Sequence, residues 1–507
     1  MASLGDLIPS AAADRAGKVV LVAGEREITY AELDDRVGRA AAALASLGVR
    51  KGDRVALLLG NVPEFVEALH GAWRLGAAVA PLNVMLTAEE AGYVLADAEP
   101  AAVVTDRAFL PTVLSTSDRV PTGHVLVTGD GPAPSGTARW EDALTNAGEP
   151  PEAAVSPEDL ALLQYTAGTT ARPKGAMLTQ GNLLANLDQM SQVPALREAE
   201  SDVVLLALPL FHIYALNVVL GITIREGASA ILVDRFDPAA TLELIERRRI
   251  TVLFGAPPMF IAWLAVAGER APDLSSVRIA VSGAAPLPGD VLEGFRERFG
   301  ITIWEGYGLT ETAPAVTTNA LGDTAKPDSI GLVLPGVEVR LVDEDGEDVV
   351  DGDPGEIAVR GPNVFQGYWR RPDDTEAAFR DGWLQTGDVA YRDEDGYLYI
   401  VDRIKDLVIV SGFNVYPKEV EDAIARHPTV AEVAVIGVPD ERTGEAVKAL
   451  IVPKSGEALT EEEILDHCRG TLARFKWPQQ IEFVDELPRH VTGKVLRRAL
   501  REPGGGP

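Results

Sequence analysis

Apolar runs and amphipathic stretches alternate along the first 330 residues of the chain. Runs such as 54–59 and 277–283 have the length and composition of buried strands. Each is followed by a stretch whose apolar positions have helical spacing, at 63–76 and 290–300. Strands that alternate with helices are typical of parallel sheets covered by helices. The pattern therefore predicts the α/β class for this part of the chain.

From about residue 330 the pattern changes to strands separated by Asp-Gly turns. Segments 337–349 and 388–403 both contain such a turn, which predicts a β-rich region built from hairpins. A shorter α/β module is expected after residue 405, with a helix near 417–427, strands at 430–438 and 446–453, and a helix from 460.

The length of the chain requires more than one core. A chain of 507 residues exceeds the size at which a single hydrophobic core stops growing. We expect a large N-terminal domain over 1–404, whose β-rich subdomain covers about 330–404. A small C-terminal α/β domain is expected over 405–507.

Composition and charge narrow the class of protein. With 46% hydrophobic and 24% charged residues, the chain has the balance of a soluble globular protein. A net charge of −30 opposes binding to nucleic acid, which needs clustered cations, and docking on anionic lipid. Cys468 is the only cysteine, so no intrachain disulfide can form. It lies in an amphipathic stretch, 464–475, which favours a buried thiol over a catalytic one.

No segment is expected to span a membrane. The most apolar window, 203–224, carries Pro209, His212 and Asn217, which suit a lipid-facing helix poorly. We predict a buried strand, a turn and a helix that line a pocket. The N-terminus lacks the pattern of a signal peptide, and a cytoplasmic location is expected.

Residues 166–175, Thr-Ala-Gly-Thr-Thr-Ala-Arg-Pro-Lys-Gly, form the candidate phosphate loop. A predicted strand at 160–166 precedes it, and a predicted helix start at 176–187 follows it. A loop rich in backbone N–H groups, hydroxyls and one cation can wrap a polyphosphate. The spacing is not that of a Walker A loop. An ordinary polar loop stays the alternative.

Four further motifs follow along the chain: 307–312 (Tyr-Gly-Leu-Thr-Glu-Thr), 386–388 (Thr-Gly-Asp), 402–421 and 488–498. With the phosphate loop, this series resembles the successive motifs of the acyl-CoA synthetase family. That family belongs to the adenylate-forming superfamily, which includes luciferases and peptide-synthetase adenylation domains. The resemblance extends from 28–37 to Arg498. It implies a large N-terminal domain and a mobile C-terminal lid joined by a hinge at Lys405.

The resemblance implies an ATP-dependent acid–CoA ligase. Such an enzyme converts a carboxylic acid into an acyl-adenylate with release of pyrophosphate, then transfers the acyl group to the thiol of CoA. ATP, Mg²⁺ and CoA are the implied cofactors and co-substrates. A medium- or long-chain fatty acid is the favoured substrate.

The resemblance also assigns roles in the ATP site. Lys494 matches the adenylation lysine, Thr310 the α-phosphate contact and Glu311 the Mg²⁺ ligand. A surface lysine and a helix N-cap are the alternatives for Lys494 and for the Thr310–Glu311 pair. Lys174 is implied to hold the β- and γ-phosphates with the loop threonines, and a solvated loop lysine is the alternative. The remaining residues implied to bind ATP are Thr166, Gly168, Thr169, Thr170, Gly283, Ala284, Glu305, Gly306, Tyr307, Asp388 and Arg403.

The acid and CoA would use other residues. An apolar acyl pocket is expected from 209–216, 254–265 and 304–308, with His212, Gly283 and Gly306 bordering the acid. The implied CoA residues are Ser411, Gly412 and Phe413, with Lys418, Arg442, Arg474 and Lys476 as candidates for its phosphates.

Two residues depart from the usual phosphate loop of the family. Ala167 stands where the family has serine, and Ala171 where it has glycine. The lost hydroxyl removes one phosphate contact, and an alanine at a positive φ would cost about 1–2 kcal/mol. We expect a working enzyme with weaker ATP binding.

Several alternatives to the fatty acid–CoA ligase stay open. They are an aryl acid–CoA ligase of the hydroxycinnamate or benzoate type, an acyl-AMP ligase that loads a carrier protein, and an acyl- or nucleotide-binding protein without turnover. No aspartate follows Phe211, where relatives that activate amino acids hold the substrate amine, so an amino acid is disfavoured. A homodimer is a further open alternative.

Overall fold

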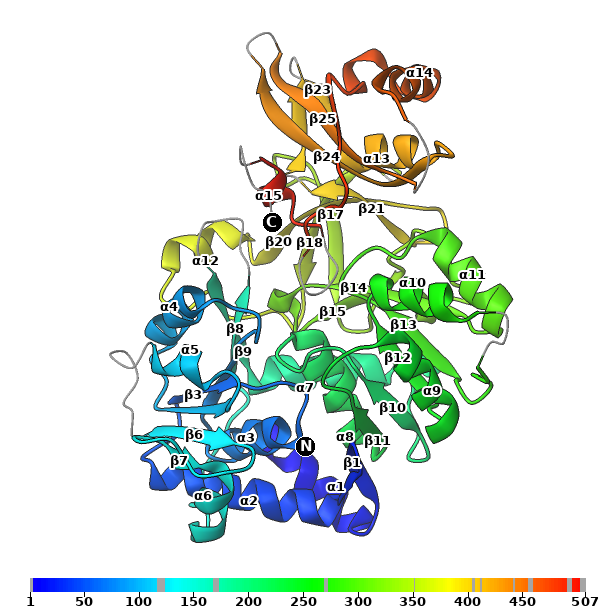
Figure 1. Cartoon of the computed structure of the whole chain (residues 1–507). Coiled ribbons are helices and arrows are strands. Elements are labelled where there is room, and N and C mark those ends of the chain that lie inside the picture. The colour runs from blue at the N-terminus through cyan, green and yellow to red at the C-terminus, as the bar shows by residue number, and fades with distance from the viewer. Residues whose placement is uncertain are drawn as a thin grey trace. The chain divides into compact units, whose positions relative to one another are not determined.

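The computed structural model describes residues 3–115, 124–166, 173–268, 272–350, 352–403, 406–410, 413–440, 443–454, 459–489 and 495–501. The chain divides into two compact units (Figure 1). Unit 1 comprises Met1–Glu338 and Val359–Leu384, and unit 2 comprises Val339–Ala358 and Gln385–Pro507. The predicted α/β class is confirmed. The domain boundary between residues 404 and 405 stays a prediction.

One sheet of unit 1 has a parallel centre and antiparallel margins. Its strands from β14 to β1 are parallel, whereas β15, β16 and β2 are antiparallel to their neighbours. Every residue of β12 and β13 is buried, as expected for parallel strands covered on both faces. In spatial order the sheet contains β16 (Leu332–Val333), β15 (Ala315–Thr318), β14 (Ile303–Gly308), β13 (Ile279–Ser282), β12 (Val252–Gly255), β10 (Val203–Leu206), β11 (Ser229–Leu232), β1 (Val19–Ala23) and β2 (Arg26–Thr29).

The other sheet of unit 1 ends in an antiparallel hairpin. The last two strands, β8 and β9, pair antiparallel, and the other pairs are parallel. In spatial order the sheet contains β7 (Ala138–Arg139), β6 (Val125–Thr128), β5 (Ala102–Asp106), β3 (Arg54–Leu58), β4 (Ala78–Pro81), β8 (Leu160–Thr166) and β9 (Lys174–Thr179).

The hairpin corrects one prediction. The strand predicted at 160–166 is confirmed as β8, but 176–179 belong to β9 and are not a helix start. Helix α7 (Gln180–Ser191) begins four residues later, at a capping box. The Thr179 hydroxyl accepts the Asn182 N–H at 3.1 Å, and the Asn182 side chain accepts the Thr179 N–H at 2.9 Å.

Helices cover the sheets of unit 1. Helices α9, α10 and α11 pack side by side (Figure 1), and Trp263 meets Phe260 and Phe295 between them with ring centroids 5.3 and 6.4 Å apart. The helices are α1 (Leu7–Arg15), α2 (Tyr30–Ser46), α3 (Pro63–Arg74), α4 (Ala88–Ala98), α5 (Leu110–Leu114), α6 (Trp140–Asn146), α7, α8 (Ile222–Glu226), α9 (Pro238–Arg248), α10 (Pro257–Val266), α11 (Gly289–Phe299) and α12 (Pro372–Ala378).

The apolar window 203–224 folds as expected. It forms β10, a turn, and a π-helix (Tyr214–Gly221) that continues into α8. All eight residues of the π-helix are buried. Within the described part of the chain, we find no helix with the length and apolar content needed to cross a bilayer.

The predicted β-rich region is also present. One sheet contains β17 (Glu338–Val342), β18 (Gly355–Arg360), β20 (Trp383–Arg392), β21 (Leu398–Arg403) and the short β19 (Phe379–Arg380). Strands β20 and β21 are antiparallel and joined by the predicted Asp-Gly turn, in which the Gly396 N–H donates to the Asp393 carbonyl at 3.0 Å.

Unit 2 contains a further α/β layer with its own core. Cys468 is buried in that core, and burial raises the pKa of its thiol to about 11. The structure therefore agrees with the prediction of a buried, unreactive cysteine. The elements are β22 (Val408–Val410), β23 (Phe413–Val415), β24 (Val430–Asp440), β25 (Gly444–Pro453), β26 (Gln480–Phe483), α13 (Pro417–Ala425), α14 (Glu461–Thr471) and α15 (Arg497–Arg501).

Candidate active site

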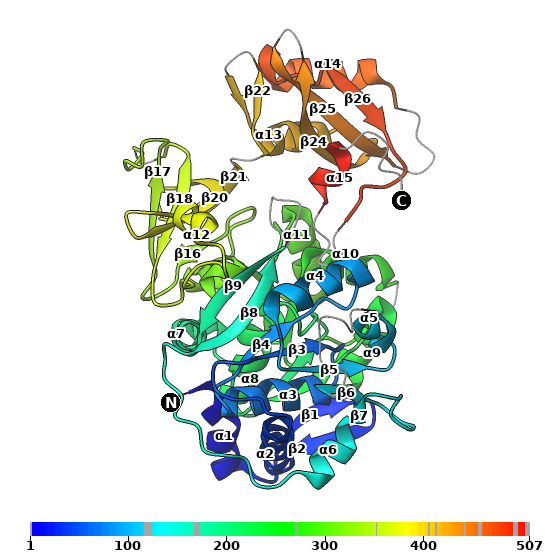
Figure 2. The same ribbon diagram turned by 90° about the vertical axis from the view of Figure 1, so that its left-hand side faces the viewer.

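The β8–β9 hairpin carries both ends of the candidate phosphate loop (Figure 2). Thr166 is the last residue of β8 and Lys174 the first of β9, and the two are register partners. The strand ladder therefore fixes both ends of the loop. Residues 167–172 fall outside the described part of the chain, among them Ala167, Gly168, Thr169, Thr170 and Ala171.

Lys174 has two close partners in unit 1. Its ammonium forms an ion pair with the carboxylate of Asp374 on α12, and its Nζ lies 5.2 Å from the centroid of the Tyr368 ring. The Lys174 side chain is only 16% exposed. These contacts argue against a solvated loop lysine, because a solvated side chain would extend into water.

Glu311 shares a partner with Lys174. It lies with Thr310 in the 3₁₀ turn η5 (Thr310–Thr312) between β14 and β15. The Tyr368 hydroxyl donates to Glu311 Oε1 at 2.8 Å. Tyr368 thus contacts the predicted metal ligand through its hydroxyl and the predicted phosphate lysine through its ring face. Sequence reasoning missed Tyr368 and Asp374.

The environment keeps the Tyr368 phenol protonated. Burial, followed by the negative charges of Glu311 and Asp374, raises the pKa of Tyr368 well above its ordinary value. The phenol therefore remains a hydrogen-bond donor at any pH near neutrality.

Buried asparagines hold the loop that contains η5. Asn217 donates to the carbonyl of Ala313 at 2.7 Å, and Asn363 donates to that of Thr312 at 2.8 Å. The hydroxyl of Thr312, at 3.0 Å from the Leu309 N–H, caps the turn. The N-cap alternative therefore does not explain Thr310. The sequence signalled only one of these two asparagines, since Asn217 is a polar residue within the apolar window 203–224.

Five of the residues implied to bind ATP lie at neighbouring strand ends. Gly283 and Ala284 follow β13, and Glu305, Gly306 and Tyr307 lie on β14, which is paired in parallel with β13. Carboxyl ends of adjacent parallel strands meet at one edge of a sheet, where ligands commonly bind. The structure therefore brings these five predicted residues together.

Tyr214 lies in the predicted acyl region and contacts Gly283. A Cβ placed on Gly283 would lie 3.1 Å from Cε1 of the Tyr214 ring. Phe254 meets Tyr214 edge to face, with ring centroids 6.1 Å apart, and both rings are buried. His212 Nδ1 lies 3.3 Å from the Tyr214 N–H, so this histidine supports the start of the π-helix.

Asp388, which the resemblance implies to bind ATP, lies in unit 2. It is 3% exposed and pairs with Arg403 across β20 and β21. The hydroxyl of Thr386 accepts the Asp388 N–H at 3.1 Å and donates to the Ile357 carbonyl at 2.8 Å, which fixes the Thr-Gly-Asp turn. For several other predicted residues of unit 2, the whole residue or its side chain lies outside the described part of the chain. They are Arg403, Lys405, Ser411, Gly412, Phe413, Arg442 and Lys494.

The candidate CoA cations of unit 2 have carboxylate partners. Lys476 Nζ lies 2.6 Å from both oxygens of Glu419, and Lys418 Nζ lies 2.7 Å from Asp422. A CoA phosphate would compete with these carboxylates. Together with Arg474 in a short 3₁₀ turn, these lysines stay a prediction for CoA binding.

Arg497 was not predicted. It follows Lys494 by three residues and donates to both oxygens of Glu421, at 2.7 and 2.8 Å. It also donates to Asp406, the residue after Lys405, at 3.3 Å. One side chain thus joins the segment that follows Lys494 to the segment that follows the predicted hinge.

The donor set at η5 fits magnesium. Among the described residues, no cluster of three or more His, Cys, Asp or Glu side chains could hold a metal alone. Mg²⁺ is usually bound by one or two carboxylates together with substrate phosphates and water. The carboxylate of Glu311, beside the Thr310 hydroxyl, suits that arrangement.

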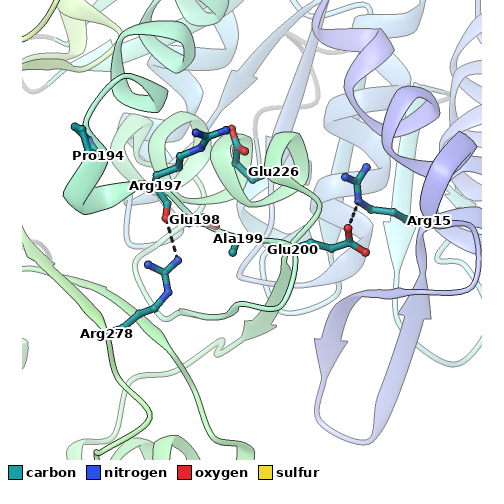
Figure 3. Close-up of a pocket in the computed structure, with 8 residues that line it drawn as sticks. All are labelled: Arg15, Pro194, Arg197, Glu198, Ala199, Glu200, Glu226 and Arg278. Atoms are coloured by element: carbon teal, nitrogen blue, oxygen red, sulfur yellow. Dashed lines mark hydrogen bonds and ion pairs between the residues drawn. The ribbon is translucent and has the colours of Figure 1, made fainter.

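A cavity of about 510 Å³ elsewhere in unit 1 has no link to this chemistry (Figure 3). Arg15 pairs with Glu200 at 3.1 Å, and Arg278 donates to the Arg197 carbonyl at 2.9 Å. No residue predicted for the active site lines it. Its lining is Arg15, Pro194, Arg197, Glu198, Ala199, Glu200, Glu226 and Arg278.

Comparison with known families identifies the chain. The family model of AMP-binding enzymes matches residues 8–369, which is more than half of the 507 residues. The chain belongs to the AMP-binding enzyme family. The model of the C-terminal domain of AMP-binding enzymes matches residues 419–494 of the same chain. The resemblance noted in the sequence is thereby confirmed.

The relatives of this AMP-binding enzyme are CoA ligases. It is 41% identical over 487 residues to the feruloyl-CoA synthase of Amycolatopsis sp, covering 95% of each chain. It is 39% identical to the long-chain-fatty-acid–CoA ligase of Escherichia coli O157:H7, covering 99% of this chain and 95% of the relative. The crystal structure of ATP-bound MatB from Rhodopseudomonas palustris superposes with a TM-score of 0.89 at 36% identity, covering 99% and 98% of the two chains. This AMP-binding enzyme is therefore an ATP-dependent acid–CoA ligase.

Proposed function

We propose that this ligase activates a compact, apolar carboxylic acid, with an aryl acid preferred over a long-chain fatty acid. The contact between Tyr214 and Gly283 supports the proposal, because it fills the space behind the strand end with an aromatic ring. Phe254 packs edge-on behind that ring. A long alkyl chain needs an open apolar channel, whereas a flat aryl tail can pack against such a ring. The similarity to a feruloyl-CoA synthase points the same way.

The proposed reaction proceeds in two steps. A carboxylate oxygen of the acid bonds to the α-phosphorus of ATP, and the bond to pyrophosphate breaks. The sulfur of CoA then bonds to the acyl carbon, AMP leaves and the thiol proton is released. Bound Mg²⁺ would supply positive charge to the phosphates.

Different residues of the chain would bind different parts of ATP and the acid. Lys174 would hold the outer phosphates, Thr310 the α-phosphate and Glu311 the metal. Asp388 would accept hydrogen bonds from both ribose hydroxyls, because a carboxylate has two acceptor oxygens. Lys494 would bridge the acid and the α-phosphate in the first step.

The second step is proposed to follow rotation of the C-terminal lid about Lys405. Rotation would withdraw Lys494 and present 411–413 to the adenylate. Two half-reactions with different needs could then share one pocket.

A fatty acid is the second candidate. The relative that acts on long-chain fatty acids covers 99% of this chain at 39% identity. The Tyr214 hydroxyl has only a long 3.5 Å contact with the Val281 carbonyl, so the ring could rotate away to lengthen the pocket.

Pyrophosphate release over a panel of aryl and fatty acids tests the proposal, with and without CoA. We expect the highest CoA-dependent kcat/KM for an aryl acid in the native enzyme, and loss of release in Lys494→Ala. Tyr214→Ala should shift the preference toward longer acids. Preference of the native enzyme for a long-chain acid would contradict the aryl assignment, and an unaltered preference in Tyr214→Ala would contradict the role of Tyr214. Release that needs a carrier protein instead of CoA would favour the carrier-loading alternative.

A further inference from the structure

We propose that Tyr368 is a positioning residue that orients the Glu311 carboxylate for the Mg²⁺–ATP complex and keeps Lys174 beside it. The inference rests on the roles proposed above for Glu311 and Lys174. It adds a third residue, from a segment 57 positions further along the chain than Glu311, which acts on both.

The backbone on either side of Tyr368 is tied to both parts of the site. Toward β9, the Trp369 N–H donates to the Gly175 carbonyl at 2.8 Å, next to Lys174. Toward η5, the Phe365 N–H donates to the carbonyl of Glu311 at 2.9 Å. The segment therefore sets the separation between the strand that carries Lys174 and the turn that carries Glu311.

The Tyr368 ring is also held in place. Its own N–H donates to the Thr375 hydroxyl at 2.9 Å, and the Phe365 ring packs edge to face at 4.9 Å. Gly367 has a φ of 120°, and a Cβ there would lie 2.4 Å from the Thr375 methyl group. Only glycine allows this close turn, which brings the tyrosine between the two charged residues.

The hydrogen bond has a direct consequence for the metal. It engages Oε1 of Glu311 at 2.8 Å, so Oε2 is the oxygen that we expect to face the ion. Mg²⁺ demands near-ideal octahedral geometry, and a freely rotating carboxylate would lose binding free energy each time the ion binds. Groups that orient a metal ligand typically change metal affinity by about 10–100-fold.

The test is ATP binding measured by calorimetry at increasing Mg²⁺ concentration, with no acid present and so without turnover. We expect Tyr368→Phe, which deletes one oxygen and keeps the ring, to raise the half-saturating Mg²⁺ concentration by about tenfold. Its ATP affinity without Mg²⁺ should stay unchanged. Tyr368→Leu should also weaken ATP binding without Mg²⁺, because the face beneath Lys174 is lost.

Tyr165→Phe is the matched control. The Tyr165 hydroxyl also donates to a carboxylate, Oδ2 of Asp97 at 2.7 Å, and Tyr165 is likewise largely buried. This variant should keep the native Mg²⁺ dependence. An equal shift in the control would overturn the inference, since any lost phenol would then have the same effect.

Glu311→Gln separates this inference from the proposed function. If Glu311→Gln shifts the Mg²⁺ dependence and Tyr368→Phe does not, the positioning role is wrong and the metal role stands. If neither variant shifts it, the assignment of Glu311 as the metal ligand fails as well, and both are overturned.

Discussion

Replacing Asp374 with asparagine should tighten ATP binding. The structure holds Lys174 in an ion pair with Asp374, so binding of the outer phosphates must compete with that carboxylate. The two side chains are 16% and 31% exposed, and a partly exposed pair of this kind contributes about 0.5–1 kcal/mol. Removal of the carboxylate charge should therefore lower the KM for ATP by about two- to fivefold. Reduced repulsion of the triphosphate acts in the same direction.

Pyrophosphate–ATP exchange at low and high salt is the assay. The decrease in the KM for ATP should shrink at high salt, because ions screen a partly exposed pair. Asp373→Asn is the control, since it removes the same charge from an exposed neighbour on α12. An unchanged or higher KM in Asp374→Asn would show that this ion pair does not compete with ATP for Lys174. An equal decrease in Asp373→Asn would assign the effect to net charge alone.

Three further variants test other parts of the structure. Burial raises the pKa of Glu198 from about 4.5 to about 8, so the folded protein holds this proton more tightly than the unfolded chain does. The stability that the proton confers is complete below about pH 4.5 and is lost as the pH rises through about 8. Glu198→Gln should therefore flatten the decline of Tm between these pH values. Gly308→Ala would place a Cβ 1.9 Å from the Pro314 carbonyl oxygen, and we expect a lower Tm and weaker ATP binding by calorimetry. Arg497→Met removes the cation that Glu421 pairs with at 2.7 Å. It should reduce pyrophosphate exchange several-fold more than thioester formation from added acyl-adenylate, and equal losses would contradict a link to Lys494.

The sequence was most informative where a residue pattern is compatible with only one type of secondary structure. Alternating apolar runs and amphipathic stretches predicted the parallel sheets, and the Asp-Gly turn after β20 predicted a hairpin. The start of α7 was misplaced because Ala-Met-Leu-Thr suits a strand and a helix equally. Antiparallel pairing with β8 decides between them, and that pairing is a tertiary contact.

The candidate site was predicted through its motifs and not through its supports. Thr310 and Glu311 stand in a recognisable motif, but Tyr368 and Asn363 lie more than 50 positions away and contact the turn only in the folded chain. Their roles depend on distances that no local pattern encodes. The effects of Ala167 and Ala171 on ATP binding stay predictions.

The register pair between Thr166 and Lys174 determines which changes the loop between them can accept during evolution. The ladder of β9 positions Lys174, and this ladder does not depend on how many residues connect the two strands. An insertion in the loop would alter closure by only a few tenths of a kcal/mol and leave the lysine where it is. A deletion within β9 would instead turn the following side chains to the opposite face of the sheet. The position of Lys174 is therefore far more sensitive to a change of length between Lys174 and Thr179 than to one before Lys174.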